Sequence, residues 1–431
     1  MREFVLENKK PLMLQEQIYT GSASFARWNP VLWFVVLFLI TNDVTIGSVK
    51  GVLITLPKIG ILVFLPFLSL RAKNAQAKWF VVKISTPLIA AILLTSVLHF
   101  RFHNVELSFL QSIVIGLMFA WLIAGSCVSM ETVEKIFKYL SLILLLHLPV
   151  SLYQSYCGEG YLTRRYMMNL GFRWRSTGLF GDPNHYAQIM LMLLPYTWTM
   201  FLKKGLKNKI LFLAMLLGIF LSGSRNAFVA SVLIFILFAV FPPYYASRIK
   251  IRFVSSCALF ALLFFFYYFA PKDVERTRVV YESIMTGEIT EKLVTPDRRR
   301  YALAKESWDN FLSSPVLGVG IGRNLIKNKG VAHNLFLDIF ADFGILGFIG
   351  YLLLAGIPFK RLLSNLKRRE IKNLPQYYTI VWSTLMGFIS FCAGGLFLST
   401  YVNRFLFLWV GLLAGLAVVT KKLSTASTEI E

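Results

Sequence analysis

Long apolar runs separated by short polar breaks recur along almost the whole chain. A run of about 20 apolar residues in a helix is long enough to cross the hydrocarbon core of a bilayer. The pattern therefore predicts an all-α fold of about twelve transmembrane helices in one integral membrane domain, residues 1–431. The second predicted span contains Pro57 and Lys58, so we expect it to be kinked or partly re-entrant. The predicted spans are 31–47, 51–70, 84–99, 108–126, 137–156, 184–202, 208–223, 226–241, 253–270, 335–357, 377–397 and 405–420.

The polar breaks predict an orientation, because cytoplasmic loops of membrane proteins are rich in Lys and Arg. Four strongly basic breaks fall on one side of a twelve-span chain, and that side is expected to be cytoplasmic together with both termini. These breaks are 71–78, 203–209, 248–252 and 360–372. The first 29 residues are polar and include three glutamates, so we expect no cleavable signal peptide and a first span that serves as a signal anchor.

Two segments on the opposite side are long, at about 157–183 and 271–334. A long loop among tight connections is a common place for function, and we expect 271–334 to form a large helical periplasmic loop. Both segments are rich in arginine, which the orientation rule does not explain for long external loops. The arginines indicate either a solvated, headgroup-facing surface or a site for an anionic substrate. They include Arg164, Arg165, Arg173, Arg175, Arg276, Arg278, Arg298, Arg299, Arg300 and Arg323.

Composition agrees with a membrane protein and excludes a soluble domain. Hydrophobic residues make up 56% of the 431 and charged residues only 16%, against about 25% charged in a typical soluble domain. The formal net charge of +23 follows largely from the basic cytoplasmic breaks, so we predict no nucleic-acid partner. The four cysteines lack pairing spacing and the five histidines lack ligand spacing, so neither a disulfide framework nor a metal site is predicted.

Arg225 is the first residue that composition does not explain. It lies in LSGSRNAFVA, between apolar runs of about fifteen residues that would each cover roughly 22 Å of a hydrocarbon core of roughly 30 Å. The tip of this hairpin is therefore expected below the outer surface, where an arginine faces a cavity or a partner. The alternative is an arginine that snorkels at a helix end, but the small residues 222–224 leave open space around it and favour a functional role.

The stretch 297–333 is the second candidate region. Asp297 is expected to cap a helix that begins at Arg298 and ends before Pro315, with an apolar stripe that either packs or lies on the membrane. The stripe is Tyr301, Ala304, Trp308, Phe311 and Leu312. The next segment, GVGIGRN, follows no strand and so indicates a tight backbone approach to a ligand or a helix instead of a nucleotide fold. His333 opens the following span and is either a general acid or base or an ordinary interface residue.

Four segments, in order, resemble the O-antigen ligase and polymerase superfamily, which comprises membrane glycosyltransferases that act on polyprenyl-diphosphate-linked glycans. LSGSRNAF resembles its Ser-Arg segment, and AHNLFLDIFADFGILGFIG resembles its His-Asn segment. RYALAKESWDNFLSSPVLGVGIGRN resembles its Arg-helix-Pro-x-x-Gly-x-Gly segment and puts the family arginine at Arg300. Upstream, STGLFGDPNHYAQ resembles a Gly-x-Phe-x-x-Pro-Asn element, so the matched motifs cover about residues 176–350.

The resemblance implies a GT-C-like, inverting glycosyltransferase at the periplasmic face of a bacterial inner membrane, with no metal, nucleotide sugar or other cofactor. Carried over to this chain, Arg225 and Arg300 would bind the diphosphate of an undecaprenyl-linked glycan donor, and His333 would position or deprotonate the acceptor hydroxyl. Loss of the diphosphate develops negative charge that guanidinium groups stabilise, and a neutral histidine can take the proton near pH 7. The implied substrate-binding residues are Arg225, Arg299, Arg300, Arg323 and Asn334.

Several alternatives stay open at this point. Arg298 or Arg299 could contact the diphosphate in place of Arg300, and Asp182 is a rival base unless it only starts a helix. The leading hypothesis is a ligase that moves a glycan onto a lipid A-core acceptor, and the close alternative is a polymerase that joins repeat units. A transporter of lipid-linked glycan would predict internal repeats and broken helices near the midplane. A receptor or scaffold would leave the Arg225, Arg300 and His333 set unexplained.

Overall fold

The computed structural model describes residues 37, 45–49, 52–55, 59–60, 63, 72–99, 101, 103–158, 175–203, 205–243, 255–257, 295–367, 371, 374–398 and 401–428. Apart from one short hairpin, these residues form helices and their connections, which confirms the all-α prediction for the bundle. The helices are α5 (Ala75–His99), α6 (Asn104–Ser126), α7 (Met130–Cys157), α8 (Pro183–Phe201), α9 (Leu206–Ser222), α10 (Arg225–Val240), α13 (Thr295–Ser313), α14 (Arg323–Asn328), α15 (Leu335–Leu366), α17 (Pro375–Gly395) and α18 (Arg404–Thr428).

Six of the described helices are long and apolar enough to cross a membrane, namely α5, α6, α7, α15, α17 and α18 as far as Leu423. The helices α8, α9 and α10 coincide with predicted spans but are shorter or less apolar. Most of the predicted spans 31–47, 51–70 and 253–270 lies outside the described residues, as do residues 271–294 of the predicted loop 271–334. The chain is thus a polytopic membrane protein, while the count of twelve spans and the periplasmic loop remain predictions.

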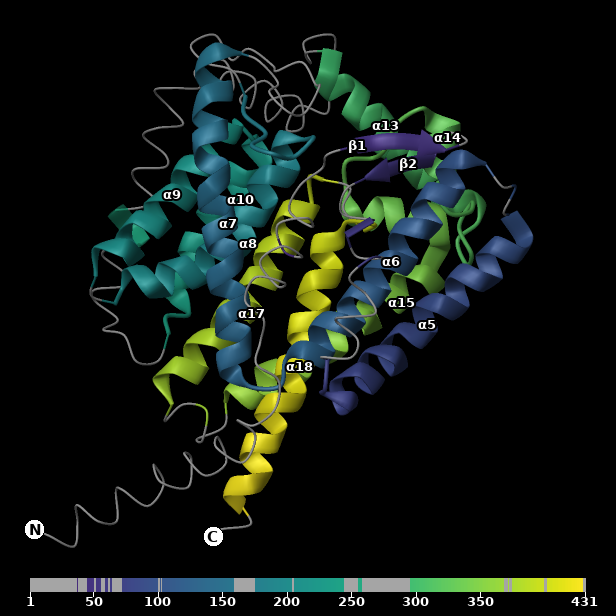
Figure 1. Cartoon of the computed structure of the whole chain (residues 1–431). Coiled ribbons are helices and arrows are strands. Elements are labelled where there is room, and N and C mark those ends of the chain that lie inside the picture. Colours follow the sequence, from purple (N-terminus) through teal and green to yellow (C-terminus); the bar gives the residue numbers. More distant parts are fainter. Residues whose placement is uncertain are drawn as a thin grey trace, which may run out of the picture.

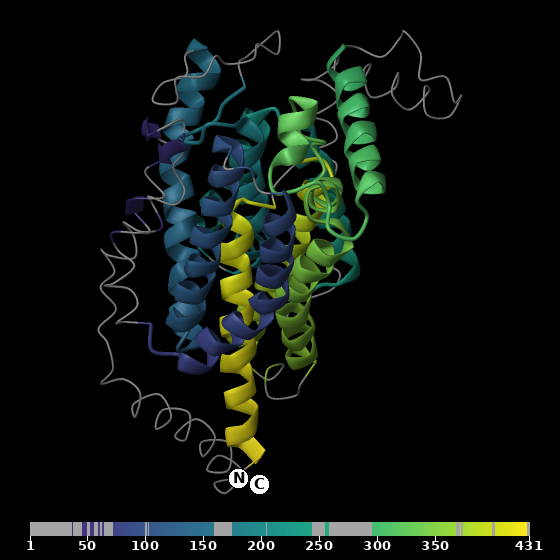
Figure 2. The same ribbon diagram turned by 90° about the vertical axis from the view of Figure 1, so that its right-hand side faces the viewer.

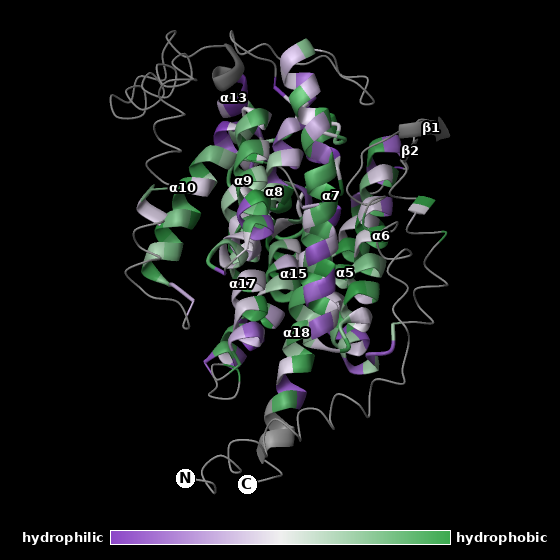
Figure 3. Ribbon diagram, turned by 60° about the vertical axis from the view of Figure 1, so that its left-hand side comes forward, coloured by the Kyte–Doolittle hydropathy of each residue, from purple (hydrophilic) through white to green (hydrophobic). Residues whose placement is uncertain are grey.

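The helices α17 and α18 lie at the centre of the bundle, and both are mostly buried. The helix α18 packs against α6 and α15, whereas α8 packs against α9 and α17 (Figures 1 and 2). Glycines permit close approach where these helices cross: a Cβ at Gly411 would lie 2.7 Å from the carbonyl oxygen of Ala120. Outer helices such as α10 show hydrophobic residues over most of their length, as expected for lipid-facing surfaces (Figure 3).

Two details of the sequence prediction are wrong. Residues Thr45–Val49 (β1) and Val52–Thr55 (β2) pair as an antiparallel hairpin where the first two helical spans were predicted to meet. Thr, Ile and Val dominate these segments, and such β-branched residues favour extended backbone. The helix α13 begins at Thr295, so Asp297 lies within its first turn and does not cap it. Pro296 suits this earlier start, because proline fits the first turn of a helix.

The long helix α15 is broken at Gly344, whose backbone angles (φ 62°, ψ −160°) are essentially restricted to glycine. Below the break, the amides of Ile345 and Leu346 cannot bond within the helix. They donate instead to the carbonyl oxygens of Pro315 and Val316, at 2.8 and 3.2 Å. The Gly-rich loop between α13 and α14 therefore serves as a cap for the second half of α15.

The same loop satisfies the other side of the break. The carbonyl oxygens of Ala341 and Asp342 accept from the amides of Val319 and Gly320, at 2.8 and 3.1 Å. Gly318 has a left-handed backbone (φ 70°), and a Cβ there would lie 2.4 Å from the carbonyl carbon of Asp342. The tight backbone approach predicted from GVGIGRN is confirmed, and the partner is a helix.

Candidate functional site

The Asp182-Pro-Asn segment opens α8. The Oδ1 atom of Asp182 accepts from the backbone amides of Asn184 and His185, at 2.7 and 3.4 Å, so Asp182 is the N-cap residue. The side chain of Asn184 points to the α9–α10 tip, where its Oδ1 accepts from the hydroxyl of Ser224 at 2.8 Å. It also accepts from the guanidinium of Arg175 at 3.1 Å. The two upstream motifs of the sequence analysis therefore meet at Asn184.

Arg225 is the first residue of α10, directly after this tip. Gly223 ends α9 with a left-handed backbone, and Ser224 caps α10 by accepting from the amide of Ala227. Arg175 stabilises the tip by donating to the carbonyl oxygen of Ser222 at 3.0 Å. The tip is thus held by its own caps and by Arg175, and Arg225 is partly buried beside it.

The turn after α17 connects the Ser-Arg-Asn motif to the His-Asn motif. The Nδ2 atom of Asn226 donates to the carbonyl oxygen of Phe397 at 2.7 Å, and that of Asn334 donates to Leu396 at 2.9 Å. Asn334 is also the N-cap of α15, because its Oδ1 accepts from the amides of residues 336 and 337, each at 3.0 Å. Arg225 and His333, each one residue before its asparagine, are therefore placed beside the same two-residue turn.

His333 lies directly before α15 with a left-handed backbone (φ 55°), and its side chain is partly buried. Burial lowers the pKa of His333 below its ordinary value, and Arg300 lowers it further. Asp182 opposes this by raising the pKa, and Arg299 adds a smaller decrease. The side chain is therefore neutral near pH 7 and can accept a proton. Arg300 and Asp182 thus act on the imidazole in opposite directions.

Arg300 and Arg299 lie in the first turns of α13. Arg300 is partly buried, while Arg299 is exposed and donates to the carbonyl oxygen of Lys329 at 3.5 Å. Of the predicted apolar stripe on α13, Phe311 packs against Phe340 of α15 with ring centroids 5.1 Å apart. Trp308 stays 45% exposed, so one side of the helix packs and the other remains open.

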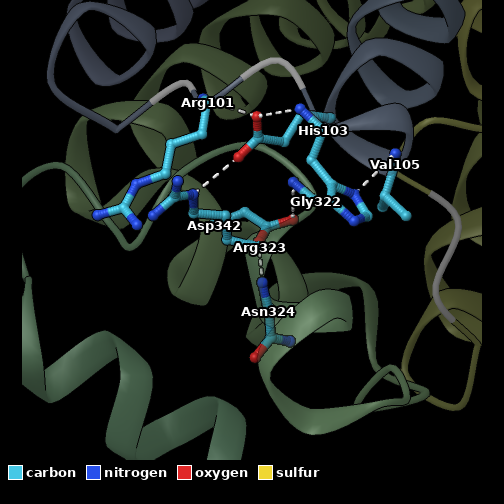
Figure 4. Close-up of polar contacts among 8 residues, drawn as sticks. Arg101, His103, Val105, Gly322, Arg323, Asn324 and Asp342 are labelled. Carbon is cyan, nitrogen blue, oxygen red and sulfur yellow. Dashed lines mark hydrogen bonds and ion pairs between the residues drawn. The ribbon is translucent and has the colours of Figure 1, made fainter.

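Arg323 is engaged inside the protein. Its Nε donates to Oε1 of Glu106 in α6 at 2.8 Å, and the two side chains are only 17% and 1% exposed. Glu106 also accepts from the amides of Arg101 and His103, at 2.8 and 3.2 Å (Figure 4). This ion pair ties the Gly-rich loop to the start of α6, which gives Arg323 a structural role.

Asp342 is a second buried anchor for the loop, and its role was not predicted from the sequence. Its carboxylate accepts from the backbone amides of Gly322 and Asn324, at 3.1 and 2.9 Å (Figure 4). The hydroxyl of Tyr401, at the start of the segment that leads into α18, donates to the same carboxylate. An acid in an apolar span is a signal that could have identified it, since buried carboxylates require partners.

Among the described side chains, no group of three or more His, Cys, Asp and Glu could hold a metal ion. The expectation of metal-independent chemistry stays a prediction. The predicted arginines Arg164, Arg165, Arg173, Arg276 and Arg278 lie outside the described residues.

Comparison with known families addresses the central part of the chain. Residues 210–352 match the family model described as O-Antigen ligase. This segment runs from α9 through much of α15 and contains Arg225, Arg300 and His333. No curated protein matches the chain. The resemblance seen in the motifs is therefore confirmed by residues 210–352, which match the O-antigen ligase family within a chain of apolar helices.

Proposed function

We propose that the chain is a ligase-type membrane glycosyltransferase that moves a glycan from undecaprenyl diphosphate to a lipid A-core acceptor at the periplasmic face of the inner membrane. The family match supports a ligase or polymerase type of function. The observation that carries the proposal is a series of hydrogen bonds that joins the start of α8, the α9–α10 tip, the 396–397 turn and the start of α15. Asn184 bonds Ser224, the neighbouring tip bonds the 396–397 turn, and that turn bonds the start of α15. His333 lies at this start, and Asp182, at the cap of α8, raises its pKa.

Two arginines near this series of contacts are suited to binding a diphosphate. Arg225 is on the hairpin tip, and Arg300 is on α13 close enough to His333 to lower its pKa. In the transfer, the bond between the sugar anomeric carbon and the phosphate oxygen breaks, and negative charge grows on the departing undecaprenyl diphosphate. Guanidinium groups already in position stabilise that charge in the transition state, and Arg can bind two phosphate oxygens at once.

His333 supplies the base for the acceptor. As the acceptor oxygen bonds to the anomeric carbon from the opposite face, its proton passes to the neutral imidazole, and the configuration inverts. Asp182 then stabilises the imidazolium, because it favours the protonated form of His333. Two backbone amides already donate to the carboxylate of Asp182 and hold it in place. It is therefore better suited to stabilising the charge of the imidazolium than to accepting the proton of the acceptor.

The remaining predicted residues receive different roles. Arg299 is exposed next to Arg300, where it would add positive charge for the lipid-linked glycan donor. The side-chain atoms of Asn334 both make bonds within the protein, and Arg323 pairs with Glu106. Within this proposal Asn334 and Arg323 are positioning residues that hold His333 and the Gly-rich loop.

A deletion strain tests the proposal. The wild-type gene should restore the glycan-capped lipid A-core on gels, whereas Arg225→Gln, Arg300→Gln and His333→Ala should not, with long polymer accumulating on undecaprenyl diphosphate. Removal of one charge-stabilising donor commonly costs about 100-fold or more in rate. The matched control is Arg101→Gln, which removes an exposed cation beside α6 and leaves this series of hydrogen bonds intact.

Two results would contradict this assignment. Full capping by all three variants at normal protein levels would remove these residues from the active site. A deletion strain with single repeat units on the lipid A-core would instead identify a polymerase.

A further inference from the structure

One feature that the proposed function does not use is a cavity at the opposite end of the bundle. It lies among the start of α5 and the ends of α15 and α18, with a volume of about 860 Å³. These helix ends lie close together at the lower end of the bundle (Figure 1). Since α15 begins beside His333 and runs away from it, the cavity is separated from the candidate active site by the length of that helix.

Basic side chains from all three helices line this cavity. They are Lys83 of α5, Arg361 of α15, and Lys421 and Lys422 of α18. None of the described residues that line it is acidic. Four cations around one concavity, and no carboxylate among its described lining residues, give this part of the wall a positive potential that favours an anion.

Specific contacts hold part of the cavity wall in place. The guanidinium of Arg361 lies over the ring of Phe80, 4.3 Å from its centroid, which orients the cation. The buried Asn365 bonds α15 to α18, because its Nδ2 donates to the hydroxyl of Thr420 at 2.7 Å and to the carbonyl oxygen of Ala417 at 3.3 Å. The wall between these two helices is therefore fixed.

The position of the cavity suits a lipid headgroup. The helices α5, α15 and α18 are all candidate membrane spans, so the cavity lies where their apolar windows give way to polar ends. Trp79 lines it and is 65% exposed, which is typical of an aromatic side chain at the membrane interface. The orientation predicted from the basic breaks puts this end at the cytoplasmic leaflet, whose anionic lipids attract basic residues.

We propose that this cavity binds the phosphodiester headgroup of an anionic phospholipid from the cytoplasmic leaflet. Its volume lies within the range of about 300–1,000 Å³ usual for small-molecule sites. Arg361 would contact the phosphate oxygens, and the lysines of α5 and α18 would contribute charge from the other two sides. One bound headgroup would thus bridge three helices and stabilise the bundle.

The ordinary explanation for basic residues at this end is the orientation rule alone. That rule requires positive charge near the helix ends but no concavity. Lys360 and Lys367 satisfy the rule at the same end of α15 without lining the cavity, and both are exposed. They therefore provide a control with the same loss of charge.

The test uses the purified full chain in neutral detergent and native mass spectrometry with defined lipids. Phosphatidylglycerol should bind, and zwitterionic phosphatidylcholine should bind far more weakly. The double variant Arg361→Gln with Lys422→Gln should weaken phosphatidylglycerol binding by about 30-fold, from about 1 kcal/mol for each cation. The control Lys360→Gln with Lys367→Gln should retain most of the binding, and Arg361→Lys should retain more than Arg361→Gln.

Free glycerophosphate is the third probe, because it offers the same phosphate without acyl chains. Failure of millimolar glycerophosphate to displace phosphatidylglycerol supports a lipid as the source of the phosphate. Equal loss of lipid binding in the cavity and control variants would overturn the proposal, and so would binding of glycerophosphate as tight as that of the lipid. Glycan transfer is not a readout in this experiment, so its result is independent of the proposed function.

Discussion

Substitution of Gly344 by alanine tests whether the break in α15 is required by the Gly-rich loop. The backbone at Gly344 lies in a region that alanine adopts only with strain of about 1–3 kcal/mol. An added Cβ would also lie 2.4 Å from the carbonyl oxygen of Val316 and 2.7 Å from the amide nitrogen of Gly318. Both neighbours are backbone atoms of the loop, so relief of the clash must move the loop itself.

Moving the loop puts at risk the two hydrogen bonds that cap the second half of α15, from Ile345 and Leu346. At about 1 kcal/mol each, these bonds and the backbone strain together predict a loss of about 3–5 kcal/mol of stability. Gly356→Ala in the same helix is the matched control. A Cβ there would meet only the side chain of Leu352, at 3.8 Å, and alanine favours a helix by up to about 1 kcal/mol.

The assay is thermal unfolding of both variants and the wild type in one detergent, followed by intrinsic fluorescence and by size-exclusion chromatography. The midpoint of Gly344→Ala should fall clearly below that of the wild type, while Gly356→Ala should match or exceed it. Midpoints for Gly344→Ala and Gly356→Ala that agree within error would refute the assigned role of the break. The assigned role would also be refuted if Gly344→Ala formed a straight, uninterrupted α15 and kept the stability of the wild type.

Three further predictions concern charges near the site. Asp182→Asn keeps the helix cap but removes the charge that raises the pKa of His333, so that pKa falls and the acid limb of the pH–rate profile should move to lower pH. An unmoved limb would contradict the electrostatic coupling of Asp182 to His333, whereas loss of activity at every pH would favour Asp182 as the base. Glu106→Gln removes the charge that pairs with the guanidinium of Arg323, and the free energy of unfolding should fall by about 3 kcal/mol. The control Glu131→Gln, which breaks an exposed ion pair, should lower it by less than about 0.5 kcal/mol in the same thermal or chemical unfolding assay. Arg225→Lys should recover part of the transfer rate lost in Arg225→Gln if the site binds a diphosphate, since a point charge remains without the bidentate geometry; equal rates for the two variants would contradict this.

The apolar pattern predicts the helices well where each span is long and its ends are charged. The helices α5, α6, α7, α15, α17 and α18 all overlap the expected spans, because a stretch of about 20 apolar residues has few alternatives in a membrane. The helix α5 begins earlier than expected, at Ala75, within the predicted basic break 71–78. The hairpin at Thr45–Val49 and Val52–Thr55 was missed because a short apolar run reads equally well as a strand or part of a helix.

The candidate site was predictable only in part. Arg225 and His333 stand out because charged or titratable residues at the ends of apolar runs need a reason. The partner of Arg323 did not stand out, since Glu106 lies 217 positions away and no periodic pattern joins them. The same holds for Asp342, because its partners, the backbone amides of Gly322 and Asn324, leave no signal in the sequence.

The turn at Leu396 and Phe397 has a consequence for swapping parts between relatives. Asn226 and Asn334 both bond main-chain carbonyl oxygens of this turn, which any residue type would supply. The turn can therefore diverge in sequence without loss of these bonds, provided that its path is kept. It lies beyond residue 352, where the family match ends. A chimera that places only residues 210–352 of this chain in a relative would keep both asparagines but pair them with the relative's own turn, whose backbone path can differ. The exchanged segment should therefore extend through α17 and the turn that follows it.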